Sequence, residues 1–344
     1  MSKRQKLSFF RLEDLPDEIL LEIFSLLDIK GVLQCGQVSK RLRAISNDQS
    51  LWLKLNIFRR NVPFSFIEKA IHNGCEYLNL SCSCIRHGAK KSEMPWKLKY
   101  LVISQACDHK WAPNGLEGVL QNCHSLEKLS VGQMRLDSFG IEKICQNGET
   151  LRILSLGECY IRSELIQKLF TKFSQLIEVN LYGNKTLLDP HLFAVIDNLT
   201  PNILKLDLSS QDYIEDKHVK TLVQKCNKIT ELGLSFTQIT NKSIESIVKN
   251  LSSLEKLDVY YTKIDYPTLC QLKSIPALKV LRCFGRKKKY GKKVKNLKLK
   301  LPHVSINKEF LKIASSSKEV NGEVDQDWFW EVRSNLQDLF PEAR

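Results

Sequence analysis

A pair of apolar residues separated by a single other residue recurs nine times along this chain. The pairs begin at Leu78, Leu101, Leu129, Leu154, Val179, Leu206, Leu232, Leu257 and Leu281. Successive pairs start between 23 and 28 residues apart, and most are preceded three positions earlier by a further apolar residue, such as Leu126 or Leu254. A self-similar period of this length indicates units that stack along one axis and share a core.

Each repeat combines the spacing of a strand with that of a helix. The pair predicts a short strand with two apolar side chains in the core and the residue between them exposed. The following dozen residues carry helical spacing, as in Ile244, Ile247, Val248 and Leu251. The period and the L-x-x-L-x-L pattern are those of leucine-rich repeats. We therefore expect an α/β fold with a curved solenoid over 75–307, its parallel strands on the concave face and its helices outside.

The first 56 residues do not follow this repeat. Pro16 suits a first helical turn, and Asp17 and Glu18 favour a helix N-terminus. The apolar residues between Ile19 and Leu27 cover almost half of the helix circumference, more than a small domain needs for its own core. Further short helices are expected at 29–38 and 39–46. We expect a tail at 1–11, a small all-helical domain at 12–56 and a linker at 57–74.

Composition excludes several classes of protein. With 344 residues and 43% hydrophobic content, the chain can bury a sizeable core, and no stretch is long and apolar enough to span a membrane. The basic N-terminus is a poor secretory signal, because acids and Pro16 interrupt the apolar run that follows it. We expect an intracellular protein of the nucleus and cytoplasm, with its 11 cysteines as reduced thiols.

The positive charge is concentrated in one segment. Residues 286–300 contain nine lysines and arginines and no acid, so removing them reduces the net charge from +14 to about +5. The run is interpretable as a nuclear import signal, a patch for nucleic acid or an acidic partner, or a solvated loop. Its single aromatic, Tyr290, disfavours base stacking, and an import signal or a phosphopeptide patch is preferred. The core of this basic insertion is Arg286, Lys287, Lys288, Lys289, Lys292 and Lys293.

No motif of catalysis or cofactor binding is present in the sequence. There is no G-x-S-x-G, no phosphate-binding loop and no H-E-x-x-H, so neither an enzyme nor a cofactor is expected. The candidate zinc cluster is His72, Cys75, Cys82, Cys84 and His87. It is disfavoured because Cys75 occupies a repeat position and the Cys-x-Cys spacing is tighter than in zinc knuckles.

The concave face is the expected binding surface, because strand alternation exposes the residues that flank each apolar pair. Aromatic residues beside charges are typical of interface hot spots. The expected substrate-binding residues are Tyr182, Lys205, Phe236, Lys256, Tyr260 and Tyr261. Alternatively, the aromatic residues pack against the tail at 308–344, whose Trp328–Trp330 segment is expected to dock on the repeats or on a partner.

The N-terminal domain carries the residues of a known motif. Leu15-Pro16-Asp17-Glu18-Ile19-Leu20, Val38-Ser39-Lys40-Arg41 and Asp48-Gln49-Ser50-Leu51-Trp52 resemble an F-box at the spacing of that family. An F-box followed by leucine-rich repeats is similar to the substrate receptors of SCF ubiquitin ligases. The resemblance implies an adaptor that binds the F-box and holds the cullin. It also implies phosphorylated cell-cycle regulators as substrates and a small cyclin-dependent-kinase regulatory subunit as an accessory.

The residues expected to contact the adaptor lie on the first helix and at the end of the domain: Leu15, Pro16, Ile19, Leu20, Ile23, Phe24, Leu27 and Trp52. The alternative is a free-standing leucine-rich-repeat scaffold that binds nucleic acid or chromatin through residues 286–300. Salt separates these two hypotheses, since phosphate binding weakens steeply with ionic strength and an apolar interface does not.

Overall fold

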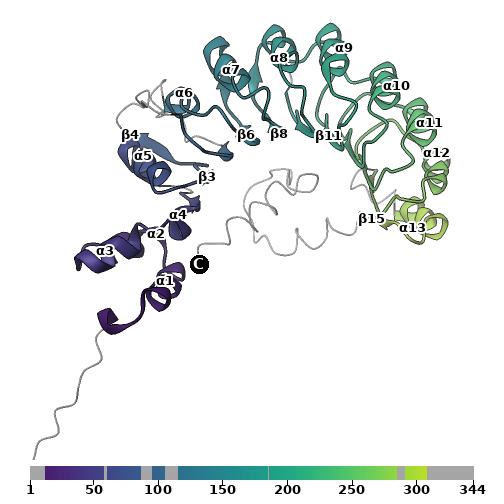
Figure 1. The fold of residues 1–344 in the computed structure, drawn as a ribbon. Coiled ribbons are helices and arrows are strands. Elements are labelled where there is room, and N and C mark those ends of the chain that lie inside the picture. The colour runs from purple at the N-terminus through teal and green to yellow at the C-terminus, as the bar shows by residue number, and fades with distance from the viewer. Residues whose placement is uncertain are drawn as a thin grey trace, which may run out of the picture.

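The computed structural model describes residues 12–57, 60–86, 95–104, 115–184, 186–284 and 291–307. These residues form an arc of strand–turn–helix units with the strands on the inner side and the helices on the outer side (Figure 1). A group of short helices precedes the arc at its N-terminal end. The expected α/β architecture is confirmed. Within the described ranges, no helix has the length and apolar content of a membrane span.

The N-terminal helices begin and end close to the predicted positions. They are η1 (Leu12–Asp14), α1 (Asp17–Ser25), α2 (Ile29–Cys35), α3 (Lys40–Ser46) and α4 (Gln49–Trp52). The side chains of Asp28, Ser39 and Asp48 cap the last three by accepting a hydrogen bond from a first-turn amide, which explains why these helices start where they do. Helix α2 ends at Cys35, short of the predicted Val38.

Among the described residues, the concave sheet has 11 parallel strands, two more than the nine predicted. In spatial order they are β1 (Lys54–Asn56), β3 (Tyr77–Asn79), β5 (Tyr100–Ser104), β6 (Lys128–Gly132), β8 (Ile153–Ser155), β10 (Glu178–Asn180), β11 (Lys205–Asp207), β12 (Glu231–Gly233), β13 (Lys256–Val259), β14 (Val280–Cys283) and β15 (Ser305–Ile306). The paired positions are in register, with Val179, Leu206, Leu232 and Leu257 on neighbouring strands.

The helices cover the outer face of this sheet. They are α5 (Phe64–His72), α6 (Gly115–Leu120), α7 (Ser138–Cys145), α8 (Ser163–Phe170), α9 (Asp189–Asn198), α10 (Asp216–Lys225), α11 (Asn241–Asn250), α12 (Tyr266–Leu269), η2 (Cys270–Ser274) and α13 (Gly291–Lys300). Two further pairs of parallel strands lie outside the concave sheet. They are β2 (Asn61–Pro63) with β4 (Cys84–Arg86), and β7 (Arg135–Leu136) with β9 (Tyr160–Ile161). Buried apolar side chains from Trp52 to Ile306 form one continuous core.

The predicted linker at 57–74 is wrong. Strand β2 and helix α5 lie within it, and Ile67 and Ala70 are buried in the same core as the repeats. The solenoid therefore begins at β1. Ile29 and Leu51 pack against both this core and the separate core of the N-terminal helices, so the two parts are joined by side-chain packing.

The chain leaves the strands through residues in the left-handed backbone region. Ser210 and Phe236 occupy equivalent positions in successive repeats, with φ of 57° and 54°. Their amides donate to the carbonyls of Ser235 at 2.8 Å and Tyr260 at 2.9 Å in the next repeat. The left-handed turn thus extends the ladder by one hydrogen bond beyond each strand. At the last repeat, the side-chain amide of Asn307 exchanges two hydrogen bonds with the backbone of Cys283, which continues the pairing of β14 with β15 beyond Ile306.

Candidate functional site

Helix α1 and the residue that follows it carry two apolar faces, of which one is buried and the other is exposed. Leu20 and Phe24 are fully buried, whereas Ile19 is 42% and Leu26 is 83% exposed. Five of the large apolar side chains that the described residues expose lie within 12–38: Leu12, Ile19, Leu26, Leu27 and Val38. A concentration of exposed apolar side chains on one small domain is typical of a protein interface. The surplus of apolar surface predicted from the sequence is therefore present.

Three of the eight predicted adaptor contacts are wrong. Leu20 and Phe24 point inward and pack with Leu42 and Ile45. Trp52 is buried, and its Nε1 donates to the carbonyl of Ser46 at 2.7 Å. Because one residue along a helix turns the side chain by about 100°, Ile19 and Leu20 lie on different faces.

The other five predicted contacts retain some exposure. Pro16, Ile19 and Leu27 are exposed, and Leu15 and Ile23 are half-buried. The prediction omitted Leu26 and Val38. Leu26 lies seven residues after Ile19, on the same helical stripe, so this spacing is the signal that could have identified it.

An arginine fixes the start of α1. The guanidinium of Arg41 on α3 donates from Nη2 to Asp17 Oδ1 at 2.5 Å and to the carbonyl of Leu15 at 2.7 Å. It thereby ties α3 to the first turn of α1 and holds the exposed apolar face in one orientation.

A row of alternating charges crosses four neighbouring strands of the concave face. Glu178, Lys205, Glu231 and Lys256 are in register on β10 to β13. Lys205 Nζ lies 3.4 Å from Glu178 and 3.6 Å from Glu231, and Lys256 Nζ lies 3.5 Å from Glu231. We call these four residues the charge row. Since the charges alternate, the row has no net charge, and the two lysines predicted to bind substrate are held by glutamates.

A second row of residues lies two positions further along each strand than the charge row, and its side chains are buried. Asp207, Gly233, Asp258 and Arg282 are in register on β11 to β14. The prediction that Asp207 and Asp258 are exposed is wrong, because side chains on strands about 4.8 Å apart cover one another. Burial raises the pKa of Asp258 to about 6, against the opposing effect of Arg282.

Three of the predicted substrate-binding aromatic residues form a cluster, which we call the aromatic cluster: Phe236, Tyr260 and Tyr261. The rings of Phe236 and Tyr261 stack at 4.9 Å with an angle of 12°, and Tyr260 meets Tyr261 edge-on at 4.8 Å. Tyr261 is 47% exposed, whereas Tyr260 is buried and supports the other two rings. Tyr182 is half-buried in another repeat, and burial raises the pKa of its phenol.

The predicted basic insertion is described only in part. Lys292 and Lys293 are exposed on α13, while Arg286 to Lys289 lie outside the described residues. The tail at 308–344, with Trp328–Trp330, also lies outside them. Its docking stays a prediction.

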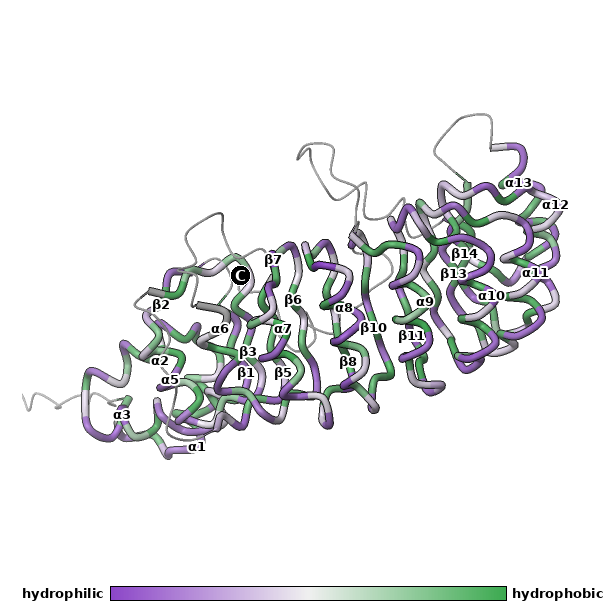
Figure 2. The backbone as a smooth tube through the Cα atoms, turned by 90° about the horizontal axis from the view of Figure 1, so that it is seen from above, coloured by the Kyte–Doolittle hydropathy of each residue, from purple (hydrophilic) through white to green (hydrophobic). Residues whose placement is uncertain are grey.

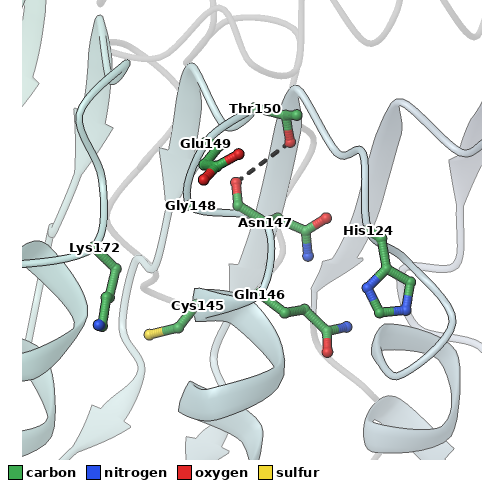
Figure 3. Close-up of a pocket in the computed structure, with 8 residues that line it drawn as sticks. All are labelled: His124, Cys145, Gln146, Asn147, Gly148, Glu149, Thr150 and Lys172. Carbon is green, nitrogen blue, oxygen red and sulfur yellow. Dashed lines mark hydrogen bonds between the residues drawn. The ribbon is translucent and has the colours of Figure 1, made fainter.

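A shallow hollow of about 280 Å³ lies at the turn that joins α7 to β8 (Figure 3). It is lined by His124, Cys145, Gln146, Asn147, Gly148, Glu149, Thr150 and Lys172. Asn147 Oδ1 accepts from the amide of Leu126 at 3.0 Å, and Gln146 Nε2 donates to the carbonyl of Leu120 at 2.6 Å. These polar side chains hold the turn to the backbone of the preceding repeat.

The candidate zinc cluster is only partly described. Cys75 is buried in the repeat core, and His87 lies outside the described residues. Within the described ranges, no group of three or more His, Cys, Asp or Glu side chains could hold a metal ion.

Two family models match this chain. One is described as the SKP2 LRR domain and matches residues 65–337; the other is described as F-box-like and matches residues 12–57. The chain belongs to the F-box/leucine-rich-repeat family. Its repeats are similar to those of SKP2, and the two domains together are those of an SCF substrate receptor. The F-box of this receptor binds the SCF adaptor and, through it, the cullin. Receptors of this family are typically non-enzymatic.

The solved structure of the leiomodin-1 actin-binding site 2 is also similar in part. It shares 16% identity over 44% of this chain and 92% of that chain, with a TM-score of 0.31.

Proposed function

We propose that this F-box/leucine-rich-repeat receptor captures phosphorylated cell-cycle regulators on its concave face and presents them for ubiquitination. The observation that carries the proposal is the packed junction between the exposed apolar face of the F-box and the repeats. Ile29 and Leu51 contact both cores, and Asn73 donates to Asn47 across the junction at 3.2 Å. A packed junction favours a constant distance between adaptor and substrate, which raises the effective concentration of substrate lysines at the ubiquitin-charged enzyme.

The aromatic cluster is the proposed anchor for the substrate. Tyr261 and Phe236 present a stacked pair of rings at the edge of the concave sheet, next to strands with charged side chains. Aromatic side chains that are held rigidly supply large contact area at a low cost in conformational entropy, and they are enriched among binding hot spots.

The charge row argues for an accessory subunit. Lys205 and Lys256 lie between glutamates, so a phosphate that approached them would have to displace those carboxylates. Reading of the substrate phosphate is therefore assigned to a partner. The small cyclin-dependent-kinase regulatory subunit implied by the family resemblance fits this role.

Co-expression with the SCF adaptor tests the F-box. The wild-type chain should co-purify with the adaptor through 0.5 M salt, because an apolar interface is insensitive to ionic strength. The double variant Ile19→Asp, Leu26→Asp should lose the adaptor and stay folded, since both side chains are exposed.

The matched control is Leu188→Asp, Leu204→Asp, which places the same two charges at exposed leucines of the repeats and should keep the adaptor. Loss of adaptor in the control, or its retention by the F-box variant, would contradict this interface.

A further inference from the structure

Helix α13 carries a dense positive charge on a firmly held backbone. Its exposed lysines are Lys292, Lys293, Lys295, Lys298 and Lys300, and the helix contains no acid. Leu297 and Leu301 are fully buried in the solenoid core, and Val294 packs against it. The lysines are therefore displayed by a helix that is fixed to the last repeats.

The positive charge extends over this end of the solenoid. The described residues 216–284 and 291–307 contain 16 lysines and arginines and six aspartates and glutamates. They account for +10 of the net charge of +14 of the whole chain. In Figure 2 the tube is predominantly hydrophilic along α10, α11 and α13. A polyanion that approached this end would meet a positive potential over several repeats.

Several surface lysines of the solenoid are neutralised by an acid, and most lysines of α13 are not. Lys99 pairs with Glu76 at 2.8 Å, Lys217 with Asp189 at 2.6 Å and Lys279 with Glu255 at 2.8 Å. Within the part of the chain that the structure describes, no acid lies at ion-pair distance from four lysines of α13: Lys292, Lys295, Lys298 and Lys300. Their charge is available to an external anion.

Part of this charge opposes what the helix itself would favour, although Lys298 and Lys300 lie in the last turn, where the helix dipole favours cations. Lys292 lies in the first turn, where the helix dipole favours acids. Lys292, Lys295 and Lys298 are three residues apart, and like charges at this spacing destabilise a helix by a few tenths of a kcal/mol per pair. A local arrangement that destabilises its own element is typical of a functional surface.

We propose that α13 binds the phosphate backbone of duplex nucleic acid, in addition to the receptor function. At 100° per residue the lysines spread over more than half of the helix circumference, so they match an extended array of phosphates better than one phosphate group. The helix has no arginine or aromatic residue, so it supplies point charges without base readout or stacking. The binding is independent of sequence and strongly dependent on salt.

Fluorescence anisotropy with a labelled 20-base-pair duplex tests this, using the full chain in complex with the SCF adaptor. If four lysines contact phosphates, the affinity of the wild type falls on the order of 100-fold between 50 and 200 mM salt. The variant Lys292→Gln, Lys295→Gln, Lys298→Gln, Lys300→Gln should bind at least 10-fold more weakly at 50 mM salt and show a flatter salt dependence. Glutamine has a helix propensity close to that of lysine, so α13 is retained.

The matched control is Lys97→Gln, Lys168→Gln, Lys172→Gln, which removes three charges from exposed lysines outside the positive end of the solenoid, and it is compared with the triple variant Lys292→Gln, Lys295→Gln, Lys298→Gln. It should stay within threefold of the wild type. An equal loss in both variants would mean that net charge alone drives binding and would overturn the assignment to α13, as would a wild type that does not bind.

An acidic protein segment is the competing partner, because Leu299 on α13 is 76% exposed among the lysines. Duplex binding should be unchanged in Leu299→Ala, whereas an acidic segment with an apolar residue would lose a contact. The second probe is an acidic peptide that contains one leucine and carries the same number of negative charges as the contacted stretch of duplex. If this peptide binds as tightly as the duplex and Leu299→Ala weakens its binding, the surface is not a nucleic-acid site.

Discussion

The carboxylate of Asp258 and the guanidinium of Arg282 form an ion pair across two neighbouring strands, with Nη1 to Oδ2 at 2.9 Å. Their side chains are only 2% and 6% exposed. Asp258 Oδ1 also accepts from the amide of Tyr260 at 3.0 Å, and the guanidinium lies 4.6 Å from the centre of the Tyr260 ring. The pair therefore holds the buried ring on which the aromatic cluster rests.

Removal of the cation should destabilise the solenoid strongly. In Arg282→Met the carboxylate of Asp258 stays buried without its partner, so we expect a loss of about 3 kcal/mol in the free energy of unfolding. The double variant Asp258→Asn, Arg282→Met should recover most of this loss, because no buried charge remains. Chemical denaturation of the three proteins measures it. A double variant as unstable as Arg282→Met would show that packing, and not charge, is responsible.

The same pair predicts a dependence of stability on pH. Burial raises the pKa of Asp258 from 3.8 to about 6. Between these values the folded chain keeps a proton that the unfolded chain releases, so this group's contribution to stability falls as pH rises from about 4 to about 6 and is constant above. Relative to Asp258→Asn, which cannot titrate, the wild type should lose about 2 kcal/mol between pH 4.5 and pH 7. A constant difference between the two proteins would mean that Asp258 titrates as it does in water.

The carboxylate of Asp207 lies so close to Gly233 that it leaves no room for a side chain at this position. An added Cβ would lie 2.8 Å from Asp207 Cγ, closer than real contacts allow. Gly233→Ala should therefore cost about 1–3 kcal/mol, and Asp207→Ala in the same chain should restore part of it.

Gly157 provides the control for this substitution, because the nearest atom to its added Cβ would be 3.6 Å away, in Asn180. Gly157→Ala should leave the thermal midpoint almost unchanged. Equal losses at the two glycines would instead implicate the backbone conformation.

The core of the repeats was predictable because stacked repeats bury the same positions in each unit, so the apolar residues recur at a fixed period in the sequence. Leu154 and Leu206 are buried where the pattern placed them. Strands β1 and β15 were missed although their signal is present: Leu55-Asn56-Ile57 and Val304-Ser305-Ile306 are pairs of the same kind, each 23 residues from its neighbour at Leu78 or Leu281. They lay in segments assigned to the F-box and to the end of the solenoid.

The site was less predictable because it depends on neighbours in other repeats. Ile19 and Leu20 have the same chemistry, and only the packing of α3 decides which one is buried. Asp258 is buried because Arg282, 24 residues later, lies beside it. No local pattern indicates that Phe236 has a left-handed backbone, since that follows from the hydrogen bond to the next repeat.

The left-handed aromatic residues give a test of the proposed substrate anchor. Tyr261 has φ of 55°, a region that disfavours bulky side chains and accepts asparagine. In Tyr261→Asn the lost stacking on Phe236 is offset by the relaxed backbone, so we expect the free energy of unfolding to change by less than about 1 kcal/mol. Capture of a phosphorylated cyclin-dependent-kinase inhibitor, measured with the adaptor and the small kinase regulatory subunit present, should fall at least tenfold.

Ser210→Asn is the matched control, because Ser210 holds the equivalent position two repeats earlier with φ of 57°. It changes the same backbone site without removing a ring, and asparagine keeps a hydrogen-bonding side chain beside the phenol of Tyr182, which Ser210 contacts in the wild type. Both stability and capture should therefore stay at wild-type values. If Tyr261→Asn captures the inhibitor as well as Ser210→Asn does, the aromatic cluster only supports the turns of the solenoid. The substrate would then have to bind elsewhere on the concave face, along the charge row.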